Sequence, residues 1–302
     1  MQHPDLLAPG SRVALVCPSG PLRDRADLDR ALDNVRSFDF HPVPGAWVMA
    51  REGYWAGTDA QRLHDLNTAL RDDSIDAVWC IRGGYGAMRL LDGLDYEALR
   101  SRPRAIIGYS DITALHCAVQ RRCELVSFHG PTARAAITDF SRDSFRRALI
   151  DGADSAGPAQ DAHVLHGGRA SGRLVGGNLA LLAALAGTPY APDYDGAIVV
   201  LEDVNEPTYR IERMLLTLRL GGSFLRCKGI VFGAFTHAAE QHEDDGRRTL
   251  PDVLREVADA LRVPCIAGVP LGHIDDQWTL PLGADAELDA DNARLTVSDR
   301  RR

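Results

Sequence analysis

The sequence AIIGYSDITAL, at residues 105–115, indicates the fold class because a strand pattern passes directly into a helix pattern within it. Its opening apolar run is typical of a buried strand, and residues 111–121 carry apolar side chains at helical spacing. Ser110 therefore lies on the turn between a strand and a helix. Its side chain stands there beside the unpaired N–H groups of a helix start.

Ser110 has two interpretations at this position. An acyl-transfer nucleophile is favoured there, because nearby backbone amides can receive the negative charge that forms on a carbonyl oxygen. The segment lacks the full G-x-S-x-G pattern of a nucleophile elbow, since Ile112 occupies the position of the second glycine. The alternative is a helix N-cap, a role that serine commonly fills. The local pattern leaves both open.

The composition is that of an ordinary globular protein, with 302 residues, 45% hydrophobic and 25% charged. A net charge of −8 argues against a nucleic-acid binder, which usually carries a basic face. No segment approaches the ~20 apolar residues that cross a bilayer, and residues 1–12 lack a secretory-signal pattern. Six single cysteines without a C-x-x-C pair favour reduced thiols. We therefore expect a cytoplasmic protein that binds neither nucleic acid nor a membrane.

The first half of the chain alternates strand and helix patterns. Buried strands are predicted for the apolar runs at 13–17, 77–81, 105–107 and 125–128. Thr58 and Gln61 form a capping box that predicts a helix start. This β-α-β order predicts a parallel sheet with helices on both faces, and ligands collect at the carboxyl ends of such strands. Three candidate ligand-binding segments follow predicted strands: 18–20, 82–86 and 109–110.

A second α/β unit is predicted in the rest of the chain. The sequence DGADSAGPAQD at 151–161 has no periodicity and is typical of a linker. We assign an N-terminal domain to 1–150, a linker to 151–165 and a smaller C-terminal domain to 166–302. Elements of the second domain are predicted as helices ending at 186 and spanning 209–220, strands at 198–201, 229–235 and 265–267, and a polar surface loop at 237–248.

Two further groups in the second half have chemical potential. Glu202 and Asp203 follow a predicted buried strand, where a carboxylate is either a structural acceptor or a triad acid that fixes the tautomer of a histidine. His273 lies on a loop rich in glycine and proline after another predicted strand. A loop histidine is commonly just solvated, but this strand-end position favours a rigidly held one.

The glycine-rich turn RGGYG at 82–86 does not match a phosphate-binding loop, because it has neither G-x-G-x-x-G nor a Gly-Lys-Ser/Thr ending. It is either a simple tight turn or a means of bringing a backbone N–H close to a substrate carbonyl. The histidine pairs 163/166 and 237/242 lack further plausible ligands, so no metal site is predicted.

Motifs spread over nearly the whole chain carry a family resemblance. They are ALVCPSGP at 14–21, IRGGYG at 81–86, IGYSD at 107–111, GGNL at 176–179, GTPY at 187–190, LEDV at 201–204, YRIERML at 209–215, GH at 272–273 and LPLGA at 280–284. In this order they resemble the LD-carboxypeptidases, a family of serine peptidases. Small departures at 19–20 and 205–208 touch no triad position.

The resemblance implies a fold and a triad. A flavodoxin-like N-terminal domain would carry Ser110 as the nucleophile, and the C-terminal domain would carry Glu202 as the acid and His273 as the base. The active site would lie in the cleft between the domains. An acyl-enzyme would form without a metal or cofactor. The backbone amides of Gly84 and Asp111 are the candidate oxyanion hole.

The resemblance also implies a reaction: hydrolysis of the L,D amide bond that releases the terminal D-Ala from murein tetrapeptides, in a homodimer. The candidate substrate-binding residues are Arg82, Gly83, Tyr85 and Arg210. Either arginine can hold a terminal carboxylate through paired hydrogen bonds, or can serve as an ordinary ion-pair partner.

Two rival functions stay open. The microcin-immunity branch of the family cuts peptidyl- or aminoacyl-nucleotide amides and would need an aromatic platform for a base, for which Trp278 and Tyr190 are candidates. The segments around Glu202 and Tyr209 look more like the murein branch. The second rival is a non-catalytic two-domain protein that binds a small ligand. It explains the architecture but not the placement of Ser, Glu and His at three strand ends.

Overall fold

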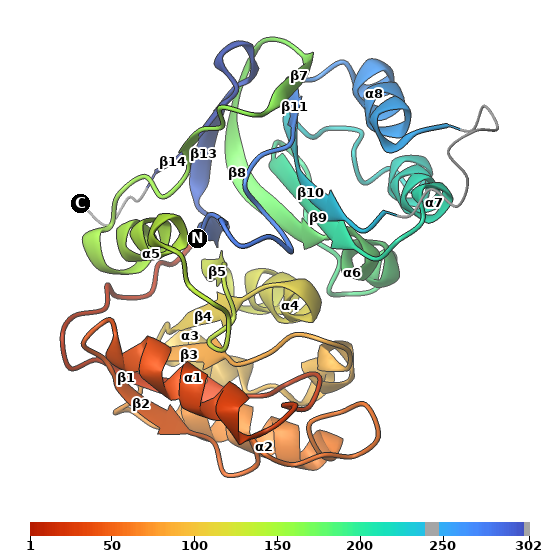
Figure 1. Cartoon of the computed structure of the whole chain (residues 1–302). Helices are drawn as coiled ribbons and strands as arrows, with labels where there is room; N and C mark the ends of the chain where they lie inside the picture. The colour runs from red at the N-terminus through yellow and green to blue at the C-terminus, as the bar shows by residue number, and fades with distance from the viewer. Residues whose placement is uncertain (239–247, 299–302) are drawn as a thin grey trace.

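The computed structural model describes residues 1–238 and 248–298. Figure 1 shows two halves, each built on its own sheet, with α4 (Thr113–Cys123) lying where they meet. The two-domain α/β expectation is confirmed. Of the predicted surface loop at 237–248, residues 239–247 lie outside the described residues.

The N-terminal half contains a six-stranded sheet in the order β12-β5-β4-β3-β1-β2. Its strands are β1 (Arg12–Val16), β2 (His41–Pro44), β3 (Ala77–Cys80), β4 (Ala105–Gly108), β5 (Ser127–His129) and β12 (Leu280–Leu282). The first five are parallel and β12 is antiparallel to β5. The remaining helices of this half are α1 (Arg25–Arg36), α2 (Asp59–Arg71), α3 (Tyr96–Ser101) and α5 (Asp139–Arg146), with short turns of other helix types at Ala87–Gly93, Ser110–Ile112 and Arg147–Asp151.

Helices cover both faces of this sheet because successive side chains of each strand point to opposite sides. Val13 and Leu15 of β1 pack in one apolar cluster with residues of α1 and α5, whereas Ala14 and Val16 pack with α2, α3 and α4. The helix α2 begins at the predicted capping box, with Thr58 as its N-cap. The predicted parallel sheet with helices on both faces is confirmed.

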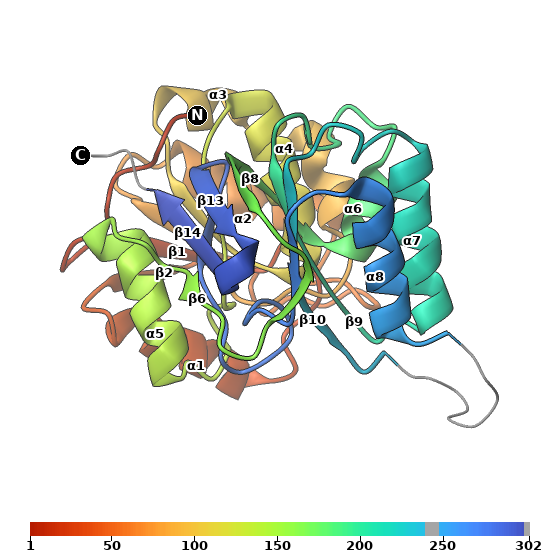
Figure 2. The ribbon, with the colours of Figure 1, turned by 90° about the horizontal axis from the view of Figure 1, so that it is seen from above.

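The C-terminal half contains an eight-stranded sheet in the order β6-β14-β13-β8-β9-β10-β11-β7. Its strands are β6 (Gly157–Pro158), β7 (His163–His166), β8 (Arg169–Asn178), β9 (Ile198–Val204), β10 (Gly229–Thr236), β11 (Cys265–Ala267), β13 (Asp285–Asp289) and β14 (Arg294–Ser298). Only β8 to β11 run parallel. The helices are α6 (Leu179–Leu185), α7 (Thr208–Leu220) and α8 (Leu250–Leu261), with a 3-10 turn at Ala290–Asn292. Figure 2 shows α7 and α8 side by side.

The two halves are interlocked. The strand β12 comes from the second half but completes the sheet of the first. At the junction, Thr113 Oγ1 of α4 accepts a hydrogen bond from the backbone N–H of Asn178 at 3.0 Å, and one apolar cluster includes residues of both α4 and α6. The predicted linker at 151–165 contains β6 and the beginning of β7. The domain boundaries themselves stay a prediction.

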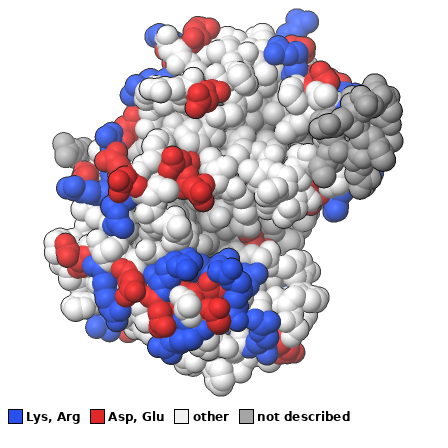
Figure 3. Space-filling view, in the orientation of Figure 1, with Lys and Arg blue, Asp and Glu red and all other residues white. Residues whose placement is uncertain are grey.

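The surface and the thiols agree with the composition. Figure 3 shows charged side chains of both signs alternating over α1, where Arg25 pairs with Asp29 at 2.9 Å. All six cysteines are free and buried. Within residues 1–238 and 248–298, we find no helix with the length and apolarity to cross a membrane.

Candidate active site

Ser110 follows β4 directly and has a left-handed backbone, with φ of 65°. Such a conformation is uncommon outside glycine, costs about 1 kcal/mol or more, and persists only where the surroundings demand it. The N-cap alternative is wrong, because Tyr109 occupies the cap of the 3-10 turn and no side chain caps it. A strained serine between a parallel strand and a helix has the geometry of a nucleophile elbow.

The turn at 82–86 lies against this serine. A Cβ atom on Gly83 would stand 3.0 Å from Ser110 Cβ and 3.2 Å from its Oγ. A Cβ on Gly84 would meet the Gly20 backbone at 3.0 Å, and Gly20 N–H donates to Gly83 O at 3.0 Å. The three segments predicted at strand ends therefore meet at one place. Within the described chain, the backbone N–H groups of Gly84 and Asp111 have no hydrogen-bond partner.

The side chain of Asp111 fastens these segments together. It is 2% exposed and accepts hydrogen bonds from Ser19 Oγ at 2.6 Å and from Ala87 N–H at 2.8 Å. Burial raises the pKa of the Asp111 carboxyl, and these hydrogen bonds oppose that rise. Sequence analysis assigned a role only to its backbone amide. Its helix-start position did not show that its side chain would be enclosed.

Glu202 and His273 form a direct contact. Glu202 lies within β9 with its side chain fully buried, and its Oε2 is 2.8 Å from His273 Nδ1. Gly272 makes this approach possible, because a Cβ at that position would stand 2.8 Å from the same carboxylate oxygen. Its φ of 116° is also one that other residues rarely adopt. The loop after β11 can therefore close onto β9.

The imidazole of His273 lies over the residue before Ser110. Its ring centroid is 4.8 Å from that of Tyr109, which joins the Glu202–His273 pair of the second half to the serine turn of the first. Among the described residues, Ser110 Oγ makes no hydrogen bond to His273. Such contacts are often long before substrate binds. The contact of Tyr109 with the histidine had no signal in the sequence beyond its place next to the serine.

Asp203 has a different environment from its neighbour Glu202. Its carboxylate accepts hydrogen bonds from Asn178 Nδ2 at 2.9 Å, Ala180 N–H at 2.9 Å and Val204 N–H at 2.8 Å. Burial raises the pKa of Asp203 to about 6. Asp203 therefore supports the start of α6, while Glu202 is the carboxylate that faces the histidine. Their strand-end position alone did not distinguish the two, and only the family resemblance selected Glu202.

The two candidate arginines differ. Arg82 is partly buried, hydrogen-bonds to the carbonyl of Pro21, and has no carboxylate partner among the described residues. Its pKa is lowered, mainly by burial and also by Arg134 nearby. Arg210 is exposed and paired with Glu206 at 3.0 Å. Arg82 therefore forms no direct ion pair among the described residues, although the Asp27 carboxylate acts on it from further away, and its guanidinium is available to an anionic substrate group.

Two buried histidines pack behind the serine turn. His116 and His129 are both 0% exposed, with ring centroids 6.5 Å apart. His116 Nε2 is 2.9 Å from Gly108 O, and the His129 ring lies 5.9 Å from Tyr109. Burial lowers the pKa of both, to about 4 for His116. These histidines are therefore neutral packing groups.

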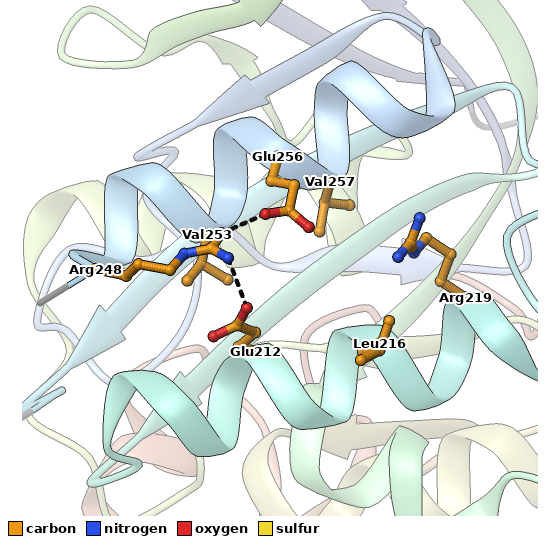
Figure 4. A pocket seen from close by; sticks show the side chains of 7 residues that line it. All are labelled: Glu212, Leu216, Arg219, Arg248, Val253, Glu256 and Val257. Atoms are coloured by element: carbon orange, nitrogen blue, oxygen red, sulfur yellow. Dashed lines mark hydrogen bonds and ion pairs between the residues drawn. The ribbon is translucent and has the colours of Figure 1, made fainter.

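Two of the cavities outside this cluster are lined mainly by residues of the second half. One of about 650 Å³ is lined from both halves and borders the loop of His273 through Ile274, with Phe140 of α5 on its other side. The other, of about 40 Å³, lies between α7 and α8 (Figure 4). There Arg248 bridges Glu212 and Glu256 at 2.9 and 2.5 Å, so its charge is already satisfied.

The aromatic candidates for a base platform are wrong. Trp278 is 2% exposed and packs in the core of the second half. Tyr190 is 8% exposed, and its hydroxyl donates to Asp92 at 2.6 Å. Neither ring has a face for a ligand. Their sequence positions carried no signal of this burial, which depends on distant parts of the chain.

A strained serine, a buried Glu–His pair and two interlocked α/β halves define a hydrolase-type site. The LD-carboxypeptidase N-terminal domain matches residues 13–130, and the LD-carboxypeptidase C-terminal domain matches residues 171–288. This chain belongs to the LD-carboxypeptidase family, and the resemblance found in the sequence is confirmed.

Three relatives show the range of the family. The murein tetrapeptide carboxypeptidase of Pseudomonas aeruginosa is 36% identical over 305 residues, covering 94% of each chain. The microcin C7 self-immunity protein MccF of Escherichia coli is 26% identical and covers 99% of this chain and 97% of its own. The solved muramoyltetrapeptide carboxypeptidase of Oxalobacter formigenes has a TM-score of 0.85 and 30% identity, covering 96% of this chain and 99% of its own.

Proposed function

We propose that this chain is a serine LD-carboxypeptidase that releases the terminal D-Ala from murein tetrapeptides, with Ser110, His273 and Glu202 as its triad. The observation that carries the proposal is the buried Glu202–His273 contact at 2.8 Å, lying on the residue that precedes a strained serine. Burying a carboxylate with one histidine as its partner costs free energy of folding. Such a cost is typical of functional sites, where the carboxylate orients the histidine.

The proposed chemistry follows from this geometry. Glu202 accepts a hydrogen bond from Nδ1–H of His273, which leaves Nε2 of the imidazole unprotonated. That nitrogen takes the Ser110 proton as Oγ attacks the amide carbonyl, and it returns the proton to the amine of the departing D-Ala. Water then attacks the acyl-enzyme with His273 again as base, releasing the shortened peptide and restoring the serine.

The unpartnered N–H groups of Gly84 and Asp111 support their proposed role as oxyanion donors. They belong to the two turns that meet at Ser110. Donors of this kind act on the charge that develops only in the transition state. Loss of one typically costs ~3 kcal/mol, or about a hundredfold in rate.

The two arginine candidates for the terminal carboxylate can now be ranked. We assign the role to Arg82, because it adjoins Gly83 and has no carboxylate partner among the described residues. Arg210 is already neutralised by Glu206. Gly83 would leave room for the substrate beside the serine.

The rivals are weaker on specific observations. The two rings that were candidates for the base platform of the microcin-type reaction, Trp278 and Tyr190, are both buried. A non-catalytic binding protein has no use for a left-handed serine next to a tyrosine that contacts a buried Glu–His pair. The sequence is also more similar to the P. aeruginosa murein tetrapeptide carboxypeptidase than to MccF, at 36% against 26% identity.

The deciding experiment is hydrolysis by the wild type and by Ser110→Ala, measured side by side on a murein tetrapeptide and on an aminoacyl-nucleotide amide. We expect D-Ala release from the tetrapeptide, and its loss in Ser110→Ala together with loss of fluorophosphonate labelling detected by mass. Ser101→Ala, which alters an exposed serine of α3, is the control. Faster cleavage of the nucleotide amide, or full activity in Ser110→Ala, would overturn the proposal.

Two further expectations accompany this function, a cytoplasmic location and a homodimer. Six buried free thiols support the proposed cytoplasmic location, where thiols stay reduced. The homodimer remains a prediction from the family resemblance. Sedimentation at micromolar concentration distinguishes a dimer from a monomer of 32.8 kDa.

A further inference from the structure

Beside the serine turn, three aromatic side chains form a surface cluster that the triad does not use. Tyr54 and Tyr85 are 62% and 57% exposed, and their ring centroids are 5.6 Å apart. Trp55 lies 4.5 Å from Tyr54 in an edge-on arrangement. We call Tyr54, Trp55 and Tyr85 the aromatic shelf. Two large rings held open to solvent bury little apolar surface, so their packing does not explain their presence.

The backbone beneath the shelf is firmly held. Trp55 lies against the serine-side turn, because a Cβ on Gly86 would stand 2.7 Å from its indole ring. Ala56 N–H donates to Ser19 O at 2.9 Å. The buried Arg62 of α2 donates to Gly86 O at 3.0 Å and to Pro18 O. The shelf is therefore a preformed surface, which lowers the entropy lost when a ligand binds.

Tyr85 of the shelf and Arg82 belong to the same turn, and their side chains contact different neighbours. Arg82 contacts Pro21 and lies near Arg134, whereas Tyr85 meets Tyr54. Between them, Gly83 lies on Ser110. If Arg82 holds the terminal carboxylate, the departing D-Ala lies on the Arg82 side of Ser110. The part of the substrate retained in the acyl-enzyme then extends toward the shelf.

The distance from Gly83 to the shelf agrees with the length of the stem peptide on the acyl side. Tyr85 is two residues from Gly83, which is at most ~7 Å along the chain. The ring of Tyr54 lies 5.6 Å beyond that of Tyr85. The stem on the acyl side has three residues, which span about 10 Å when extended. The shelf is thus within reach of the amino end of the stem, where murein carries its sugar.

We propose that Tyr54 and Tyr85 form a subsite that binds a pyranose ring of the amino sugar attached to the stem peptide, an inference that rests on the proposed function. The C–H face of a sugar packs on an aromatic ring, while the tyrosine hydroxyls offer polar partners to its substituents. Arg89 lies over Trp55 at 4.9 Å but is paired with Asp59 at 2.6 Å, so the shelf presents no net cation and suits a neutral ring.

The test uses binding to the inert Ser110→Ala protein as well as turnover. Calorimetry compares a free tetrapeptide with the same peptide carrying N-acetylmuramic acid, in Ser110→Ala alone and combined with Tyr54→Ala or Tyr85→Ala. We expect the sugar-linked peptide to bind more tightly, and each tyrosine change to weaken only that ligand, by about tenfold. Tyr85→Phe should retain most of the effect. Tyr209→Ala, at a tyrosine of α7 that is 58% exposed, is the matched control.

In the active protein, the same changes should raise KM for the sugar-linked substrate more than KM for the free tetrapeptide. Equal weakening of both peptides would show that the tyrosines merely support the turn, and no weakening of either would show that the shelf is not a subsite. Tighter binding of a nucleoside than of the sugar-linked peptide would show that the shelf binds a base, and would overturn the sugar subsite. Because binding is measured without turnover, failure of the hydrolysis proposal is separable from failure of this one.

Discussion

His273 Nδ1 lies 2.8 Å from Glu202 Oε2, although 71 residues separate them in the sequence. The carboxylate is completely buried and the imidazole is 19% exposed, so one face of the ring remains available to a proton donor while the other end is held. The centroid of the same imidazole lies 4.8 Å from that of Tyr109, the residue before Ser110.

Glu202→Gln tests whether this contact orients the base. An amide in place of the carboxylate stabilises the wrong histidine tautomer, and we expect kcat to fall by about ten-thousandfold, in line with the loss of the acid in the trypsin triad. Far-ultraviolet circular dichroism should be unchanged. Glu206→Gln, at the carboxylate paired with Arg210, is the control. A fall of less than tenfold would argue against a triad acid at this position.

Asp111→Ala tests the buried carboxylate that joins the turns. The Ser19 hydroxyl and the Ala87 N–H both donate to its Oδ2, so the change removes the partner of both donors. We expect the free energy of unfolding to fall by about 1–3 kcal/mol and kcat to fall with it. Urea titration measures the first. Ser19→Ala removes only one donor and should cost less; a larger loss there would show that Asp111 is not the centre of this network.

Gly83→Ala tests the contact of the turn with the nucleophile. The new Cβ would stand 3.0 Å from Ser110 Cβ, and Gly83 does not have a left-handed backbone, so the change acts by contact alone. We expect kcat to fall at least tenfold with little change in stability. Gly53→Ala offers the opposite case, because Gly53 has φ of 58° and open space around it. It should lower the melting temperature without changing kcat.

Arg82→Ala tests the carboxylate anchor. Loss of a charge-assisted hydrogen bond costs about 1.5–3 kcal/mol, so KM for a substrate with a free carboxylate should rise roughly ten- to a hundredfold. A substrate amidated at its carboxyl end should respond little to the change. Arg210→Ala should alter KM less than twofold. The opposite ranking of the two arginines in steady-state kinetics would assign the anchor to Arg210.

His116→Gln tests a pH dependence of stability. Burial lowers the pKa of His116 to about 4, below the ~6.5 of an unfolded histidine, so the unfolded chain takes up a proton first on acidification. Stability from this residue is present above pH 6.5 and is lost as the pH falls toward 4. The loss of unfolding free energy from this residue between pH 7 and pH 5 should be about 2 kcal/mol.

Glutamine keeps a donor for Gly108 O but does not titrate, so the variant should show a shallower loss of unfolding free energy between those two pH values. Urea unfolding at pH 7 and pH 5 measures it. His129 also has a lowered pKa and keeps part of the slope in the variant. Identical slopes in the two proteins would contradict the assignment.

Much of the fold was predictable because its signals are local. The strand before Ser110, the capping box at Thr58 and the alternation of strands with helices each depend on residues within one or two turns of the chain. The glycine-rich turn and the serine turn were predicted at strand ends. Parallel strands bring such ends to one edge, which is why these segments lie together.

Other features could not be predicted from local patterns. Glu202 and Asp203 are neighbours with opposite environments, since alternate residues of β9 face different sides of the sheet. Arg82 and Arg210 are both plausible anchors until their partners are known. Trp278 became a core residue because the segment before β12 folds back onto the second sheet.

The sequence by itself determined the α/β class and the family, because apolar periodicity, caps and ordered motifs are properties of short stretches of chain. Through the family resemblance it also selected the serine, glutamate and histidine of the proposed triad. Only the tertiary structure decided that the glutamate faces the histidine, that the serine backbone is left-handed and that the aromatic shelf is open to solvent. Those properties depend on packing between distant segments, such as those of Tyr109 and His273, and the free energy of such packing is not encoded in any one segment.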